Sequence, residues 1–328
     1  MSTAAVSKHL HGTVGLHHLY QPPTARAQRS AMLPQPYGST QALKAAHFGG
    51  FSKPRSLNLV VVFSNLVIPW AAFCIVFWAL SFSLRFSHPV MAGGLVLTFA
   101  LAAGISAFAA MRWSNNERAS HWYHYFTLSM ALAVSLGGFL GTMNYRYIME
   151  DAYTLMMDLK LYTGVDVGQM KGQQMMDAGL VQFDHGALDL RKSLGFRDGG
   201  NTYCVAPITN GEGNLPVYDF WAVGVNCCSS TRPDFECGQY SNLKARAGLR
   251  LLSSEDRVHF KLAVQAAEAT FDLRSAHPLF FEWVEDPVDE VTKRRSTGYQ
   301  FFLFCLLAHF GVSVLGVTAS IFKYAQLD

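Results

Sequence analysis

Charged side chains are scarce in this sequence. Asp, Glu, Lys and Arg make up 15% of its 328 residues, whereas about a quarter is usual in a soluble domain. Of the 23 acidic residues, 21 lie between Glu150 and Glu290, and only Glu117 and Asp328 lie elsewhere. This distribution excludes a uniformly soluble globule, a disordered acidic chain and a nucleic-acid binder with a basic domain face. It indicates a membrane protein that carries one water-soluble domain.

Catalytic motifs are also missing, because the sequence has no Gly-rich phosphate loop, no Gly-x-Ser-x-Gly and no His-Glu-x-x-His. Asp184 and His185 form an acid–base pair by residue type alone, and no nucleophile motif accompanies them. A run of five acidic residues lacks the central Gly and the ligand spacing of a calcium loop, which favours a solvated face: Glu282, Glu285, Asp286, Asp289 and Glu290. We therefore expect no catalytic residue and no cofactor, although an enzyme without a recognisable motif remains an alternative.

Four stretches without any charged residue are long enough to cross a bilayer. A hydrocarbon core requires about 20 apolar residues in a helix, because lipid offers the backbone no hydrogen-bond partner. The four runs span residues 56–84, 90–111, 119–145 and 296–322. They predict a membrane α-helical four-helix bundle in a 3+1 arrangement. A soluble α+β domain at 146–295 is inserted between the third and fourth helices, and a short tail follows at 323–328.

Residues 1–55 have a composition of their own. They contain six Lys or Arg, five His and no acidic residue, and prolines at 22, 23, 34 and 36 interrupt any periodicity. This composition predicts a disordered basic tail. An acid-free leader with Arg and Ser also fits an organelle transit peptide, so cleavage of residues 1–55 and an organelle membrane stay open.

The positive charges predict the orientation in the membrane. Lys and Arg mark the cytoplasmic side, and six of them precede the first helix, whereas the first hairpin has only Arg85. We expect a cytoplasmic N-terminus and a large domain that is extracellular or lumenal. Lys293, Arg294 and Arg295 lie on the domain side and oppose this, but long loops cross membranes largely regardless of charge.

Four of the six cysteines lie within 34 residues of the large domain, and Cys74 and Cys305 fall in predicted membrane helices. The clustered four are Cys204, Cys227, Cys228 and Cys237. An even set in a Cys-poor chain predicts two disulfides in an oxidising compartment, with three pairings open. A bridge between the adjacent pair is the least favoured, because neighbouring side chains point to opposite faces of a strand. A four-thiolate zinc site is the alternative, but its spacing differs from that of paired zinc knuckles.

The domain shows both kinds of periodicity. Strands are predicted at 179–183, 202–208, 217–225 and 279–284. A helix is predicted over 255–273, with Ser253 or Ser254 as its N-cap. One face of that helix is apolar: Phe260, Leu262, Val264, Ala267 and Phe271. The third membrane helix is expected to continue as a stalk into 147–161.

Polar residues within the predicted membrane helices are few. His309 lies 13 residues from each end of the 296–322 run, where an ionisable group costs about 3 kcal/mol or more. We expect a neutral His309 hydrogen-bonded to another helix, with Asn65 and Ser64 as candidate partners. Proton transfer or ion passage through His309 is the alternative.

Small residues at four-residue spacing predict the helix contacts, because they let two backbones approach closely. Ala100 and Gly104 form one such pair and Ser106 and Ala110 another, both on the second helix. Gly137 and Gly141 form the third pair, on the third helix. Packing within the monomer is the simpler interpretation, and lateral contact with a partner is the alternative.

Three short segments resemble the tetraspanin family. Phe63-Ser64-Asn65 followed by Trp70 resembles the first helix of that family, and the segment 111–117 resembles its polar inner turn. Cys227-Cys228 resembles its Cys-Cys-Gly signature, although Ser229 follows here in place of glycine. The resemblance implies a membrane scaffold that binds membrane-protein partners through its large domain and its helix faces, as a homo- or hetero-oligomer in the lipid bilayer.

A second resemblance rests on the domain. Asp219-Phe220-Trp221-Ala222-Val223-Gly224 and Asn226-Cys227-Cys228-Ser229, with 277–281, are similar to segments of membrane proteins from dinoflagellate-type algae. It covers the chain from about residue 57 onward and implies no activity. The leading hypothesis is therefore a tetraspanin-like scaffold. A transporter or channel subunit that uses His309, and a membrane-bound enzyme, are the alternatives.

Overall fold

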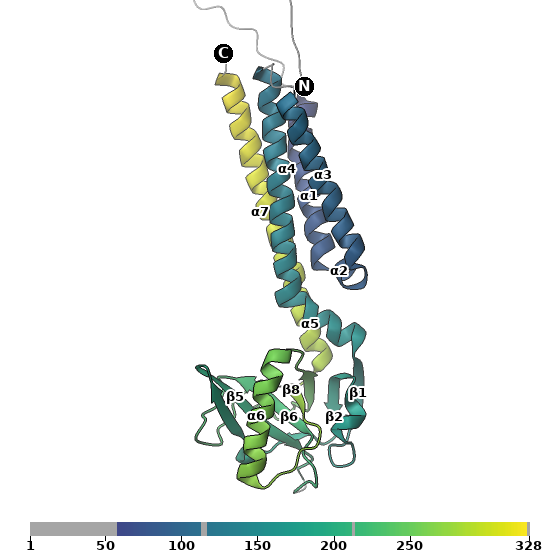
Figure 1. Ribbon diagram of the computed structural model, residues 1–328, viewed down its shortest axis with the longest axis vertical. Coiled ribbons are helices and arrows are strands. Elements are labelled where there is room, and N and C mark those ends of the chain that lie inside the picture. The colour runs from purple at the N-terminus through teal and green to yellow at the C-terminus, as the bar shows by residue number, and fades with distance from the viewer. Residues whose placement is uncertain (1–57, 113–116, 212–213, 327–328) are drawn as a thin grey trace, which may run out of the picture. The chain divides into compact units, whose positions relative to one another are not determined.

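The computed structural model describes residues 58–112, 117–211 and 214–326. The predicted basic tail 1–55 and most of the polar turn at 111–117 lie outside these residues. Four helices are long and apolar enough to cross a membrane, and they indicate a multi-pass membrane protein (Figure 1). They are α1 (Leu59–Ser81), α3 (Pro89–Arg112), the helix that begins with α4 (Glu117–Asn144), and α7 (Pro287–Gln326).

The short helix α2 (Ser83–Ser87) joins α1 to α3. The helices α1 and α4 form the central pair of the bundle, and α3 and α7 each pack against both of them. Figure 1 shows α3 and α7 on opposite sides of this pair. Aromatic rings fill the contact between α1 and α7, where Phe77 meets both Phe301 and Phe302 edge to face.

The third long helix continues well beyond its charge-free run. After α4 it passes through a π-helical turn (Tyr145–Met149), α5 (Glu150–Tyr153) and a second π-helical turn (Thr154–Asp158). The first turn packs Tyr145 and Met149 into a cluster with Phe82 and Tyr153. The continuation predicted from the sequence is therefore present, and it ends at Asp158.

The rest of the described chain folds into a separate sheet-rich domain. Seven of its eight described strands follow the order β1-β2-β7-β8-β6-β5-β3, and the eighth, β4, pairs with β5. The sheet is mixed, because β1–β2 and β6–β8 are parallel and the other pairs are antiparallel. The strands are β1 (Lys160–Val165), β2 (Ala178–Phe183), β3 (Ala187–Leu188), β4 (Leu194–Asp198), β5 (Asn201–Thr209), β6 (Phe220–Val225), β7 (Ala247–Arg250) and β8 (Leu279–Val284).

The helix α6 (Ser254–Phe271) lies across one face of this sheet (Figure 1). Ser253 is its N-cap and accepts a hydrogen bond from the Asp256 amide. The sequence placed Leu262 in the buried face, and this was wrong because Leu262 is 40% exposed. The face consists of Phe260, Ala263, Val264 and Ala267, which pack against Trp221 and its neighbours. The domain also contains two short 3₁₀ helices, Gly172–Met175 and Leu190–Lys192.

Candidate functional site

The four clustered cysteines form two disulfides in the domain. Cys204 bonds to Cys228 and Cys227 bonds to Cys237, with Cα separations of 5.8 and 5.2 Å. Disulfide sulfurs are not thiolates, and the thiolate is the form of cysteine that binds zinc. The grouping of three of these sulfurs within 4.8 Å of one another therefore reflects two adjacent bridges.

The Cys204–Cys228 bridge ties the chain that follows β6 to strand β5, and the Cys227–Cys237 bridge closes a loop within that chain. Asn226 turns this chain with a positive φ of 59°, and the Glu236 amide donates to the Cys227 carbonyl. Gly224 leaves room for the second bridge, because a Cβ there would lie 2.6 Å from the Cys227 sulfur. The two bridges thus hold the 226–237 segment as a rigid surface of the domain.

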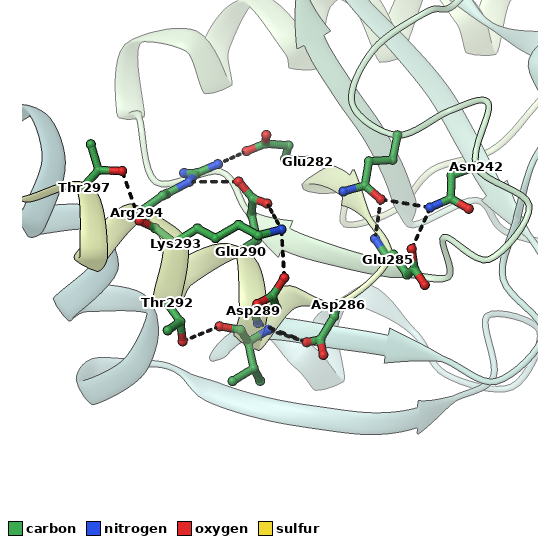
Figure 2. A network of polar contacts seen from close by, with 12 residues as sticks. Asn242, Glu282, Glu285, Asp286, Asp289, Glu290, Thr292, Lys293, Arg294 and Thr297 are labelled. Carbon is green, nitrogen blue, oxygen red and sulfur yellow. Dashed lines mark hydrogen bonds and ion pairs between the residues drawn. The ribbon is translucent and has the colours of Figure 1, made fainter.

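Polar side chains form a network around the start of α7 (Figure 2). Asp286 caps the helix by accepting from the Val288 and Asp289 amides at 2.8 and 3.2 Å. Lys293 then pairs with Asp289 at 2.8 Å, and Arg294 pairs with Glu282 and Glu290. On the far side of the acidic run, Asn242 donates to Glu285.

The acidic run is thus partly an ion-pair network that joins β8 to α7. Lys293 and Arg294 therefore both have carboxylate partners within this network.

His309 of α7 packs against an aromatic ring of α1. Its ring stacks on Phe73 with centroids 4.1 Å apart and an interplanar angle of 2°. The adjacent Trp70 indole donates to the Leu306 carbonyl at 3.2 Å and meets Phe310 edge to face. The Nδ1 atom of His309 is buried and makes no hydrogen bond with any described residue.

The predicted partners of His309 were wrong. Asn65 donates to the Val61 carbonyl, and Ser64 donates to the Val60 carbonyl, within their own helix. Asn65 lies eight residues before Phe73, which is about 12 Å along a helix. Both side chains instead line a mainly apolar cavity of about 400 Å³ that Trp122 and Phe126 of α4 border.

The small residues divide between two environments. Gly137 and Gly141 face α1, where an added Cβ would lie 3.1 Å from the Phe73 carbonyl and 3.0 Å from the Phe77 carbonyl. Ala110 is buried and Ser106 is half-buried on α3. Ala100 and Gly104 are exposed, and an added Cβ at Gly104 would meet nothing within 4 Å. The expected contact of this last pair within the monomer is therefore wrong.

Asp219 has a structural role that the sequence analysis did not predict. It is 3% exposed, and its carboxylate accepts from the backbone amides of Gly172, Ala276 and His277, each at 2.9 Å. The neighbouring Trp221 indole donates to the Tyr218 carbonyl at 2.7 Å. The Asp-Phe-Trp segment thus ties two distant loops to the sheet.

The Asp184–His185 pair lies at the surface. Its closest polar atoms are 3.5 Å apart, and the side chains are 62% and 74% exposed. Neither burial nor a neighbouring nucleophile among the described residues supports a catalytic role for this pair.

Comparisons of this chain with protein-family models, with curated proteins and with solved structures found no match.

Proposed function

We propose that this chain is a tetraspanin-like integral membrane scaffold. Three helices precede the sheet domain and one follows it, the N-terminus is cytoplasmic, and the domain is extracellular or lumenal. The domain and the outer helix faces bind membrane-protein partners, which include further copies of the chain or different proteins.

The exposed face of α3 carries this proposal. Only 6% of the most apolar stretch of α3 is buried, against 22–28% in the other three long helices. Glycine in a helix costs about 1 kcal/mol relative to alanine, yet Gly93, Gly94 and Gly104 have nothing within 4 Å of an added Cβ. Small residues in membrane helices serve close packing. A helix from a partner would use a face that the monomer leaves open.

The disulfides support the proposed orientation. Such bonds persist in secreted, periplasmic or lumenal compartments and are rare in the cytosol. Two adjacent bridges also make the 226–237 segment a preformed surface, and preformed surfaces bind with a smaller loss of conformational entropy.

The transporter alternative draws less support from the geometry. A proton path needs a chain of polar groups across the bundle, whereas the His309 ring is stacked on the apolar ring of Phe73. Asn65 and Ser64 bond within α1 at a different depth. An aromatic packing role explains His309 without a flux.

Site-specific photocrosslinking in native membranes tests the scaffold. We would place p-benzoylphenylalanine at Phe108 on the open face of α3, and at Phe304 on α7 as the matched control. The two phenylalanines are 67% and 70% exposed. A scaffold should give a discrete protein adduct from position 108 and mainly lipid adducts from position 304.

The same experiment tests whether a partner helix approaches α3 closely at Gly104. Gly104→Ile should abolish the adduct from position 108, whereas Gly311→Ile, at an equally open glycine of α7, should leave it unchanged. Lipid adducts alone from both positions, or a protein adduct that survives Gly104→Ile, would contradict the proposal.

A further inference from the structure

A cavity of about 300 Å³ opens beside α6 in the sheet domain. Its wall combines the end of β7, one side of α6 and the loop that leads into β8. Apolar groups, among them Val264, Leu279 and Phe280, form part of this wall. The volume lies at the lower end of the range for small-molecule sites, which is about 300–1,000 Å³.

Positive charge dominates the polar part of this cavity. Arg250, Arg257 and Lys261 all line it, against the single carboxylate of Glu268. Three cations and one anion leave a net charge of +2. Glu268 accepts a hydrogen bond from the Ser275 amide at 2.6 Å. None of the three cations forms a salt bridge within the described ranges 58–112, 117–211 and 214–326.

One guanidinium nitrogen of Arg250 is held away from water without a counter-ion. Its Nη1 atom is buried and has no hydrogen-bond partner in the described chain, while its guanidinium lies 5.7 Å from the Phe281 ring centroid. Desolvation by burial, and then repulsion from Arg257, lower the pKa of Arg250 to about 10. A buried polar group without a partner is costly, and an anion in the cavity would remove that cost.

The loop that leads into β8 forms a rigid part of the cavity wall. Asp219 accepts from the amides of Ala276 and His277, both of which line the cavity. Gly172 lies directly against the His277 carbonyl, where a Cβ would collide with it. The loop is therefore fixed before any ligand binds, so that binding requires little reordering.

We propose that this cavity binds a dianionic oxyanion, namely a phosphate or sulfate group carried by a small molecule or by a lipid headgroup. The net charge of +2 matches a dianion. A planar guanidinium presents paired N–H donors that fit the oxygens of such a group, and Lys261 adds a point charge. The adjoining apolar wall accommodates a non-polar part of the same ligand. This site is independent of the scaffold function and of the α3 face.

Calorimetry on the full-length protein in phosphatidylcholine nanodiscs tests the site. Inorganic phosphate and sulfate are the probes, with chloride at equal ionic strength as the reference. We expect saturable binding of both. Arg257→Gln and Lys261→Gln should each weaken it at least about tenfold, because each removes a charge-assisted hydrogen bond to the anion. Both side chains are exposed, so the fold should persist.

The matched control is Arg197→Gln, which removes an exposed cation of β4 outside the cavity. It should leave phosphate binding unchanged. The proposal is overturned by the absence of saturable binding in the wild-type protein. Binding that Arg257→Gln and Lys261→Gln leave intact, or that Arg197→Gln weakens equally, would overturn it too.

Arg250→Met provides a second readout. Without phosphate, its melting temperature should equal or exceed that of the wild type, because the variant removes a guanidinium whose buried Nη1 atom has no hydrogen-bond partner. Phosphate should raise the melting temperature of the wild type and not that of the variant. A phosphate-induced rise of equal size in both proteins would overturn the assignment of Arg250.

A further experiment with an anionic lipid distinguishes a lipid headgroup from a soluble ligand as the source of the phosphate or sulfate group. Nanodiscs with phosphatidic acid should stabilise the wild type more than Arg257→Gln if the ligand is a headgroup. Equal stabilisation of the two proteins, together with binding of free phosphate, identifies a soluble ligand. The scaffold proposal can fail in the crosslinking experiment without changing any of these results.

Discussion

Asp219 connects three parts of the chain through one carboxylate. Its oxygens accept from the amides of Gly172, Ala276 and His277, which lie 47, 57 and 58 residues away in sequence. The carboxylate is buried, so an amide that lost its acceptor oxygen there would stay unpaired in a dry environment.

We expect Asp219→Asn to destabilise the domain by about 2 kcal/mol or more, because an amide supplies one acceptor oxygen and brings two donors of its own. Thermal unfolding of the full chain measures the effect. Asp184→Asn, at a side chain that is 62% exposed, is the matched control and should change stability little. Similar melting temperatures for the two variants would contradict the role of Asp219.

We expect the ionisation of Asp177 to make the free energy of unfolding depend slightly on pH in the acidic range. Hydrogen bonds from Lys160 and then Tyr162 lower the pKa of Asp177 below its ordinary value of 3.8. The carboxylate therefore stabilises the fold above the unfolded pKa, and this contribution is lost as the pH falls through the lower, folded pKa. The stability difference between wild type and Asp177→Asn should be full at neutral pH and vanish in stronger acid. A difference that grows on acidification would refute this assignment.

At the scale of elements, the α1–α4 contact depends on glycine. Gly141→Leu places a side chain against the Phe77 carbonyl and the Leu80 Cβ, both within about 3.1 Å of an added Cβ. We expect a loss of about 1–3 kcal/mol through overpacking. Gly138→Leu, on an open part of the same helix, should be tolerated. Unfolding in a denaturing detergent titration compares the two, and equal stability would argue against this contact.

The Cys204–Cys228 bridge joins residues 24 apart. Replacing both cysteines with alanine should cost the domain roughly 3 kcal/mol, the usual value for loops of this length. Cys74 is a free cysteine, and Cys74→Ala should have little effect. Calorimetric unfolding under non-reducing conditions measures both variants. An unchanged midpoint for the double variant would show that the bridge contributes no stability.

The elements with strong local patterns were predictable from the sequence. The apolar strands β2, β5, β6 and β8 alternate or form continuous runs, and α6 has a clear period and cap. The shorter or more exposed strands β1, β3, β4 and β7 were missed. For example, β7 has four residues, one of them glycine, and it is a strand because β2 and β8 pair with it on both sides. Pairing of this kind is a non-local effect that no short window contains.

At the scale of the whole molecule, the scaffold and transport hypotheses differ in what they require of His309. We expect His309→Phe to keep the fold and the α3-dependent adduct, because phenylalanine can also stack on Phe73 and leaves no buried Nδ1 unpaired. Crosslinking and a pH-jump flux assay in sealed vesicles test both hypotheses. A pH-dependent flux that His309→Phe abolishes would favour transport.

The sites were less predictable than the elements. The cysteine count predicted two bridges, but three pairings remained until the fold placed β5 beside the chain after β6. The cavity with Arg250 and Lys261 is invisible in sequence, because its wall comes from distant segments that only the sheet brings together. His309 was identified by its place in an apolar run, whereas its stacking partner depends on the relative depth of two helices.

The most direct test of the account is disulfide mapping of the protein from intact membranes, with thiols blocked before lysis. We predict two bridged peptides under non-reducing conditions, one joining Cys204 to Cys228 and one joining Cys227 to Cys237, while Cys74 and Cys305 carry the blocking group. Blocked Cys204, Cys227, Cys228 and Cys237 would show a reduced domain. That result would contradict both the disulfide-held surface at 226–237 and its placement outside the cytosol.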